Sequence, residues 1–158
     1  MVARTLRTGV LLAALVLATQ TFVALGWLRP VVVAGDSMSP TLEAGQRITV
    51  LRARPPRRWD AVVLRSPTDA NRLVVKRLVG LPGEAVTFRD GTVLIDGERR
   101  NPPARLGVYY GALGNPTWRP GPDEGFVVGD NPLVSIDSRN WDHAAGVPMR
   151  LVVGVVAE

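Results

Sequence analysis

The stretch Val86-Thr-Phe-Arg-Asp-Gly-Thr-Val-Leu-Ile95 decides the fold class of this chain. Asp90-Gly91 separates two short runs that are rich in β-branched and apolar residues. An Asp-Gly pair readily adopts the positive φ angles that a two-residue hairpin turn needs. The stretch therefore predicts a β-hairpin over residues 86–95.

Similar short apolar runs, bounded by turn residues, recur along the rest of the chain. The sequence contains 16 Gly and 13 Pro, which favours many turns over long helices. Leu81-Pro82-Gly83-Glu84 predicts a tight turn, with Pro fixing φ at the first corner and Gly taking a positive φ at the second. We expect a mainly β domain with strands at 31–33, 47–51, 61–64, 73–79, 85–88, 92–95, 125–128 and 151–156, and a long surface loop over 101–122.

The N-terminal region has a different composition. Residues 8–28 contain no charged side chain, and about 20 apolar residues suffice to span a bilayer core. Arg4 and Arg7 precede this run and Trp27 lies near its end, which places the N-terminus in the cytoplasm. We predict a cytoplasmic tail over 1–7, a single transmembrane anchor over 8–28 and an extracytoplasmic domain over 29–158. A signal peptide cleaved after Ala18 is the alternative, although the apolar run continues well beyond that site.

Composition excludes several classes of function. The 158 residues contain no Cys, which rules out disulfides, thiolate metal sites and a cysteine nucleophile. The net charge of +5 comes from scattered Arg, which predicts contact with membrane lipid and no binding of nucleic acid. Asp130, Asp137 and Asp142 lack His or Glu at ligand spacing, so we expect neither a metal site nor a cofactor.

Two residues stand out as candidates for chemistry. Lys76 is the single lysine among 19 basic residues and lies in an apolar run, where burial would lower its pKa. Ser37 lies in Gly35-Asp-Ser-Met-Ser-Pro-Thr41, which Pro40 keeps from entering a helix. Taken alone, an outward-facing strand lysine and a solvated loop serine explain both residues as well. The single histidine, His143, has no triad-like context.

Three segments, taken in order, resemble the conserved boxes of type I signal peptidases. They are Ser37–Thr41, Val75–Glu84 and the segment from Gly129 to Trp141, and Asp60 after Trp59 matches a fourth position. The resemblance covers roughly residues 8–156. It implies a small β-rich domain related to the self-cleaving repressor proteases, which use a Ser/Lys pair.

The resemblance also implies a role for each matching residue. Ser37 would be the nucleophile and Lys76 the general base, with the backbone N–H of Ser37 stabilising the oxyanion. The supporting and substrate-binding positions are Ser135, which would bond Lys76; Asp137, paired with Arg77 and Arg139; and Asp36, Met38, Val74 and Val75 around the substrate. Gly35 departs from members that carry a hydroxyl there, and residues 142–145 interrupt the usual sequence before Gly146.

The activity implied is that of a serine endopeptidase which removes signal peptides from exported precursors at the outer face of the cytoplasmic membrane. Its partners would be those precursors and membrane lipid. The substrate would lie as an extended strand beside residues 31–36 and 73–75. A processing protease dedicated to one precursor, or an inactive membrane-anchored scaffold of the same fold, is the alternative. A scaffold would be expected to lose Ser37 or Lys76, and both are present.

Overall fold

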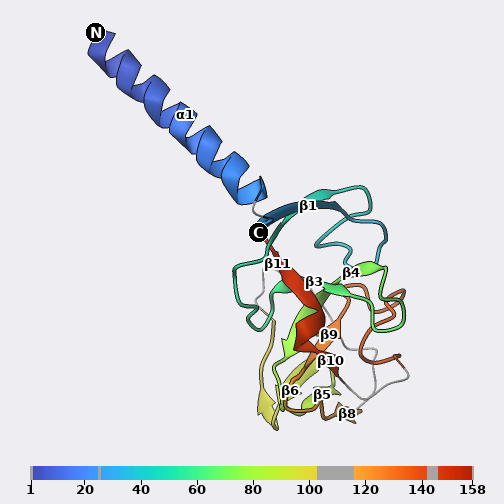
Figure 1. Cartoon of the computed structure of the whole chain (residues 1–158). Helices are drawn as coiled ribbons and strands as arrows, with labels where there is room; N and C mark the ends of the chain where they lie inside the picture. Colours follow the sequence, from blue (N-terminus) through green and yellow to red (C-terminus); the bar gives the residue numbers. More distant parts are fainter. Residues whose placement is uncertain (1, 25, 103–115, 142–145, 158) are drawn as a thin grey trace.

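Two antiparallel sheets make up the body of the computed structural model, which describes residues 2–24, 26–102, 116–141 and 146–157 (Figure 1). The larger sheet has the strand order β1-β2-β11-β3-β4-β9-β10, and the smaller has the order β7-β6-β5-β8. The strands are β1 Leu28–Val32, β2 Arg47–Leu51, β3 Ala61–Arg65, β4 Leu73–Gly80, β5 Val86–Arg89, β6 Thr92–Ile95, β7 Glu98–Arg99, β8 Thr117–Trp118, β9 Glu124–Val128, β10 Val147–Pro148 and β11 Val152–Val156. A 3-10 helix, Met149–Leu151, joins β10 to β11.

The predicted hairpin is confirmed. β5 and β6 pair from Val86↔Ile95 to Arg89↔Thr92, and the turn residues Asp90 and Gly91 have φ angles of 49° and 75°. The predicted turn after β4 is confirmed as well, because Gly83 has a φ of 79° and Glu84 N donates to Leu81 O at 3.1 Å. Each of the eight expected strands is present, with ends that differ by at most a few residues.

Three strands were not predicted, namely β7, β8 and β10. Each has two residues, which is too short to leave an alternating pattern in the sequence. β8 lies within 101–122, so the prediction of a continuous loop is wrong at Thr117–Trp118; residues 103–115 lie outside the described part. β7 follows Asp96-Gly97, whose φ angles of 50° and 85° form a second Asp-Gly turn like that at Asp90-Gly91.

The core consists of three clusters of buried residues, one between the two sheets and two on the larger sheet. One cluster joins the end of β4 and β9 to the smaller sheet and includes Val79, Phe88 and Phe126, all fully buried. The Phe88 ring lies 6.2 Å from that of Phe126 and 5.8 Å from that of Trp118. Two further clusters fill the larger sheet around β2 and β3. β4 is therefore held on both sides by packed residues, which makes it a rigid support.

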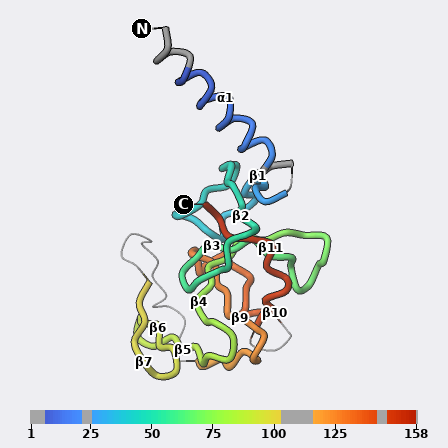
Figure 2. Tube along the Cα trace, turned by 60° about the vertical axis from the view of Figure 1, so that its left-hand side comes forward, coloured from blue at the N-terminus to red at the C-terminus, as the bar shows by residue number. Residues whose placement is uncertain are grey.

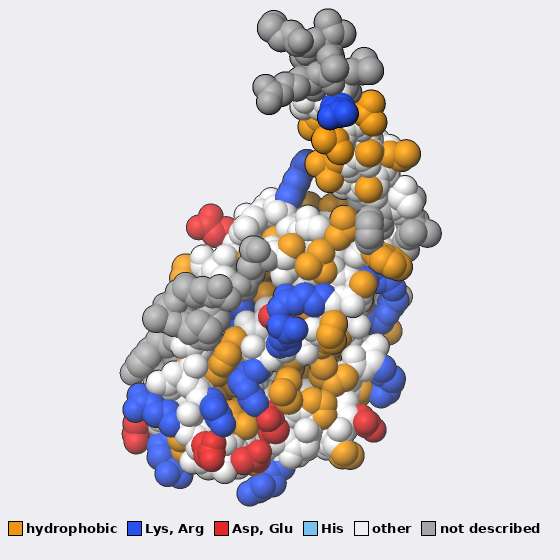
Figure 3. Space-filling view, turned by 90° about the vertical axis from the view of Figure 1, so that its left-hand side faces the viewer, with side chains coloured by type: hydrophobic (Ala, Val, Ile, Leu, Met, Phe, Trp, Pro, Cys, Tyr) orange, Lys and Arg blue, Asp and Glu red, His pale blue; other side chains and the backbone are white. Residues whose placement is uncertain are grey.

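The N-terminal helix α1, Val2–Ala24, projects away from the strands (Figure 1, Figure 2). Its apolar side chains are exposed, Leu11 by 70% for example, and they cover this part of the helix in Figure 3. Among the residues that the structure describes, however, no helix combines the length and the hydropathy needed to cross a membrane. The predicted helix is thus confirmed, whereas a membrane span over 8–28 is not. The helix ends at Ala24, Gly26 has a φ of 70°, and β1 begins at Leu28, the last residue of the predicted anchor.

Candidate active site

One end of β4 has a free edge. β9 pairs with β4 only from Arg77 to Gly80, while β3 pairs with the whole segment from Leu73 to Arg77. Among the described strands, residues 73–75 therefore have a neighbour on one side only. Unpaired N–H and C=O groups at such an edge can bind an extended peptide.

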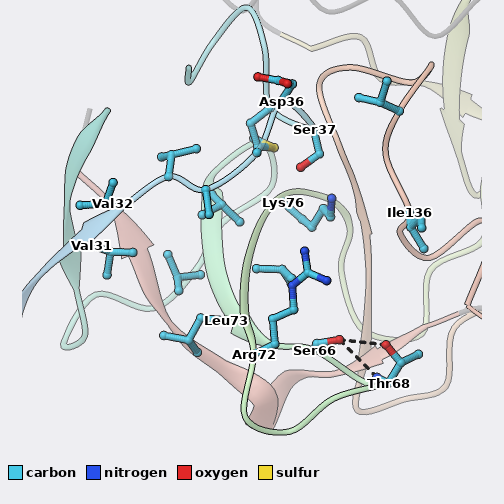
Figure 4. A pocket seen from close by; sticks show the side chains of 18 of the residues that line it. Val31, Val32, Asp36, Ser37, Ser66, Thr68, Arg72, Leu73, Lys76 and Ile136 are labelled. Atoms are coloured by element: carbon cyan, nitrogen blue, oxygen red, sulfur yellow. Dashed lines mark hydrogen bonds between the residues drawn. The ribbon is translucent and has the colours of Figure 1, made fainter. Parts of the chain in front are cut away.

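A cavity of about 380 Å³ lies beside this edge. The Ser37 hydroxyl and the Lys76 amine both point into it, from the loop after β1 and from β4 (Figure 4). The four predicted substrate positions also line it: Asp36, Met38, Val74 and Val75. Residues that are far apart in the sequence are thus brought to one hollow.

The loop that carries Ser37 is anchored by neighbouring side chains that are buried in the core. Met38 and Leu42 are buried in the core cluster around β2, and Leu42 N donates to Met38 O at 2.9 Å. Ser39 N donates to Asp36 O at 3.1 Å, so the segment turns as predicted. Ser37 is half-buried on this turn, with its side chain directed into the cavity.

Gly129 allows the segment after β9 to come close to the Ser37 loop. Asn131 N donates to Ser37 O at 3.0 Å. A Cβ atom at Gly129 would lie 2.4 Å from Ser37 O and 2.2 Å from Ser135 Oγ, which is closer than real contacts. Only glycine therefore fits at this position.

Lys76 is 3% exposed and is held by a chain of hydrogen bonds. Its Nζ donates to Ser135 Oγ at 3.0 Å, and Ser135 Oγ donates to Asp137 Oδ2 at 2.5 Å. Asp137 Oδ2 also accepts from Gly129 N at 2.8 Å. These bonds fix the amine at one place in the cavity and provide the Ser135–Lys76 contact that the resemblance implied.

Burial lowers the pKa of Lys76 from 10.5 to about 8. The negative charge of Asp137 opposes this effect, as does Asp130 more weakly, while the positive charges of Arg139 and Arg72 add to it. Among the described residues, no carboxylate lies within ion-pair distance of Lys76 Nζ. A substantial fraction of the amine is thus neutral at mildly alkaline pH, and a neutral amine can accept a proton.

The ion pairs beside the site differ in part from the prediction. Arg139 pairs with Asp137, with its Nε atom 2.7 Å from Asp137 Oδ1, as expected. Arg77, also predicted to pair with Asp137, pairs instead with Asp130, with an Nη2–Oδ2 distance of 2.5 Å. The reason is strand alternation, because neighbouring residues of β4 point to opposite faces and Asp137 lies on the Lys76 side.

Sequence reasoning missed several cavity residues, among them Arg72, Val134 and Ile136. Arg72 lies four residues before Lys76, so an extended backbone places both on the same face, a signal that the sequence carried. Val134 and Ile136 flank Ser135, and both are largely exposed. Their position follows from the fold of the 131–138 loop, which no local pattern predicts.

In the described part of the chain, no group of three or more His, Asp or Glu is arranged to hold a metal ion. Asp142 and His143 lie outside the described residues.

Comparison with known proteins agrees with the resemblance. The family model described as "Signal peptidase, peptidase S26" matches residues 3–158. A signal peptidase I of Leptolyngbya laminosa is 35% identical over 157 residues, covering 89% of this chain and 70% of that protein. Signal peptidase I T of Bacillus subtilis is 37% identical over 124 residues, covering 70% of this chain and 63% of that protein. The chain thus spans about two thirds of the length of these relatives.

The fold is similar to that of a solved relative as well. The crystal structure of a signal peptidase I from Enterococcus faecalis superposes with a TM-score of 0.55 at 30% identity, covering 66% of this chain and 98% of that one. With a family match over almost its whole length, the chain belongs to the signal peptidase family, peptidase S26, a family of serine endopeptidases.

Proposed function

We propose that Ser37 and Lys76 form a catalytic dyad which removes signal peptides from exported precursor proteins. The observation that carries this proposal is the buried Lys76 amine, bonded to Ser135, with its pKa lowered to about 8 and opening into the same cavity as Ser37. A surface lysine would keep its proton at neutral pH and could not serve as a base.

The reaction follows from these positions. The neutral amine of Lys76 takes the hydroxyl proton of Ser37 as Ser37 Oγ attacks the scissile carbonyl carbon. The backbone N–H of Ser37 stabilises the oxyanion that forms. Lys76 then gives the proton to the leaving amine, and water hydrolyses the acyl-enzyme with Lys76 again acting as base. Gly35 supplies no hydroxyl for a second oxyanion donor.

The precursor would bind as an extended strand along the free edge of β4, from Leu73 to Val75, with β1 and the following residues on its other side. Val31 and Val32 line that opposite wall of the cavity, which makes both walls largely apolar. Main-chain hydrogen bonds would then hold the peptide, while the apolar walls select its side chains.

The test is cleavage of a panel of exported precursors by the full chain in detergent. Ser37→Ala should abolish cleavage, because it removes the hydroxyl that would attack the scissile carbonyl. Ser39→Ala is the matched control, since Ser39 belongs to the same turn but does not line the cavity, and it should cleave at close to the wild-type rate. Cleavage by Ser37→Ala would rule out Ser37 as the nucleophile. Cleavage of a single precursor would favour the dedicated protease, and failure of wild-type protein on the whole panel would favour the scaffold.

We further propose that the domain works at the outer face of the cytoplasmic membrane, with its N-terminus inside. The uncharged run of residues 8–28 and the exposed apolar side chains of α1 support this, because lipid would cover them. Protease added to intact cells should digest the domain beyond Pro30. Protection of the domain from added protease would contradict this location.

A further inference from the structure

Arg72 occupies the end of the cavity opposite Asp36, and its guanidinium is directed into the cavity toward Lys76 (Figure 4). Its backbone is fixed on both sides, because Arg72 N donates to Asp69 O at 3.0 Å and Ser66 N donates to Arg72 O at 2.8 Å. The turn between β3 and β4 thus fixes the position of the Arg72 backbone at the edge of the cavity.

No described residue pairs with the Arg72 side chain, in contrast to other arginines of the domain. Arg54, Arg58, Arg77 and Arg139 each bond a carboxylate at 3.1 Å or less. Asp36 is the one acidic residue among the described residues that line the cavity, and it lies beside Ser37 and not beside Arg72. The cavity therefore offers a positive charge that the described residues leave uncompensated. A guanidinium binds a carboxylate through two parallel hydrogen bonds, which makes it well suited to such a partner.

The distance from Arg72 to the reacting atoms defines which residue of a bound peptide could meet it. Arg72 precedes Lys76 by four residues, and an extended chain rises about 3.3 Å per residue, so their backbones lie about 13 Å apart along the strand. A peptide extended beside Leu73–Val75 advances at the same rate. The backbone of Arg72 is then beside a residue about three or four positions before the scissile bond. Because the guanidinium points toward Lys76, it can meet a side chain about two to four positions before that bond.

We propose that Arg72 is a specificity residue, which selects precursors carrying Asp or Glu about two to four residues before the cleavage site. The inference rests on the proposed function, since it assumes that the precursor lies along this edge of β4. An anionic lipid headgroup is the other possible partner for a cation near a membrane. The peptide is favoured because the guanidinium points into the cavity, toward the amine that the scissile bond must reach.

The experiment scans one Glu through positions two to five before the scissile bond of a precursor peptide, with Gln at the same position for comparison. Binding is measured with the full-length Ser37→Ala variant, which keeps the cavity but not the nucleophile, and kcat/KM is measured with wild-type protein. At one position, the Glu peptide should bind and react about tenfold better than the Gln peptide, which is typical of a hydrogen-bonded charge pair.

Three further variants identify the residue responsible. Arg72→Gln should remove the preference for Glu, and Arg72→Glu should reverse it toward a peptide with Lys at that position. Arg65→Gln is the matched control, because Arg65 lies next to this turn at the end of β3, is exposed and does not line the cavity. It should keep the wild-type preference.

Equal binding of the Glu and Gln peptides at every position would overturn the role of Arg72. An Arg72→Gln variant that keeps the preference for the Glu peptide would overturn it as well. If that variant also loses binding to anionic vesicles, the partner of Arg72 is a lipid headgroup and not the peptide. If wild-type protein cleaves none of the peptides, the proposed function fails, and the binding measurements still decide whether Arg72 selects an acidic peptide.

Discussion

Lys76 and Arg77 are adjacent cations on β4, and their surroundings differ. The Arg77 side chain is fully buried and forms two hydrogen bonds with Asp130, whose side chain is also fully buried. Lys76 is almost as buried, yet its amine bonds the neutral hydroxyl of Ser135. The nearby carboxylate, Asp137, is itself paired with Arg139.

The difference shows how one strand carries both a structural and a chemical cation. A guanidinium cannot lose its proton in a protein, so Arg77 needs a buried counter-ion, and the pair joins β4 to the segment after β9. An amine can lose its proton. Burial without a direct counter-ion therefore lowers the pKa of Lys76 instead of requiring a partner.

The largest expected effect on stability comes from breaking the structural pair. Asp130→Asn leaves the charge of Arg77 buried without compensation and should lower the free energy of unfolding by about 3–5 kcal/mol. Glu98→Gln is the control, because the Glu98–Arg100 pair has side chains that are 73% and 57% exposed and should contribute almost nothing. Denaturant unfolding measures both. A loss of less than about 1 kcal/mol for Asp130→Asn would contradict a structural role for the pair.

Replacing Lys76 by an apolar residue should raise the free energy of unfolding, whereas Asp130→Asn lowers it. At pH 7 the folded protein holds a buried Lys76 whose pKa is about 8 instead of 10.5, which costs at most about 3 kcal/mol. Lys76→Met should thus stabilise the fold while abolishing cleavage. Between the folded and unfolded pKa values only the unfolded state binds the proton, so wild-type stability rises with pH and the advantage of Lys76→Met shrinks above about pH 8. A destabilised Lys76→Met protein at pH 7 would contradict this account.

A smaller effect is expected from the hydroxyl that holds the amine. Ser135→Ala removes the 3.0 Å bond to Lys76 Nζ and should lower kcat about 100-fold. Ser138→Ala is the control, since Ser138 Oγ accepts from Val127 N at 3.0 Å and, within the described part of the chain, Lys76 Nζ bonds Ser135 and not Ser138, so the variant should change stability more than kcat. Steady-state kinetics with circular dichroism separates the two effects. Wild-type kcat in Ser135→Ala would remove Ser135 from the site.

Local patterns in the sequence predicted the eight longer strands and the turns between several of them. The predictions of the Asp90-Gly91 and Pro82-Gly83 turns were correct, because each turn depends on the φ preferences of its own residues. Two-residue strands such as β8 and β10 were not predicted from the sequence, because they form only where a longer partner strand, β5 or β9, lies alongside.

The site could be predicted less completely than the fold. The lone lysine and the Ser37 loop were visible in the sequence, and the resemblance related them to Ser135 and Asp137. The partner of Arg77 was not, because Asp130 is 53 residues away and reaches Arg77 only through the pairing of β4 with β9. Strand alternation places Arg72 on the face of Lys76, but among the many arginines of the chain nothing local distinguishes it.

The most direct test of the central claim is the pH dependence of kcat/KM for the wild-type protein on one precursor peptide. We predict a rise of about tenfold per pH unit at acidic and neutral pH, with a midpoint near the Lys76 pKa of about 8 and a plateau above it. Burial is the main cause of this lowered midpoint, and the charges of Asp137, Arg139, Arg72 and Asp130 adjust it. A profile that is flat through neutral and mildly alkaline pH, or whose midpoint falls near the ordinary pKa of a carboxyl group, would show that Lys76 is not the base.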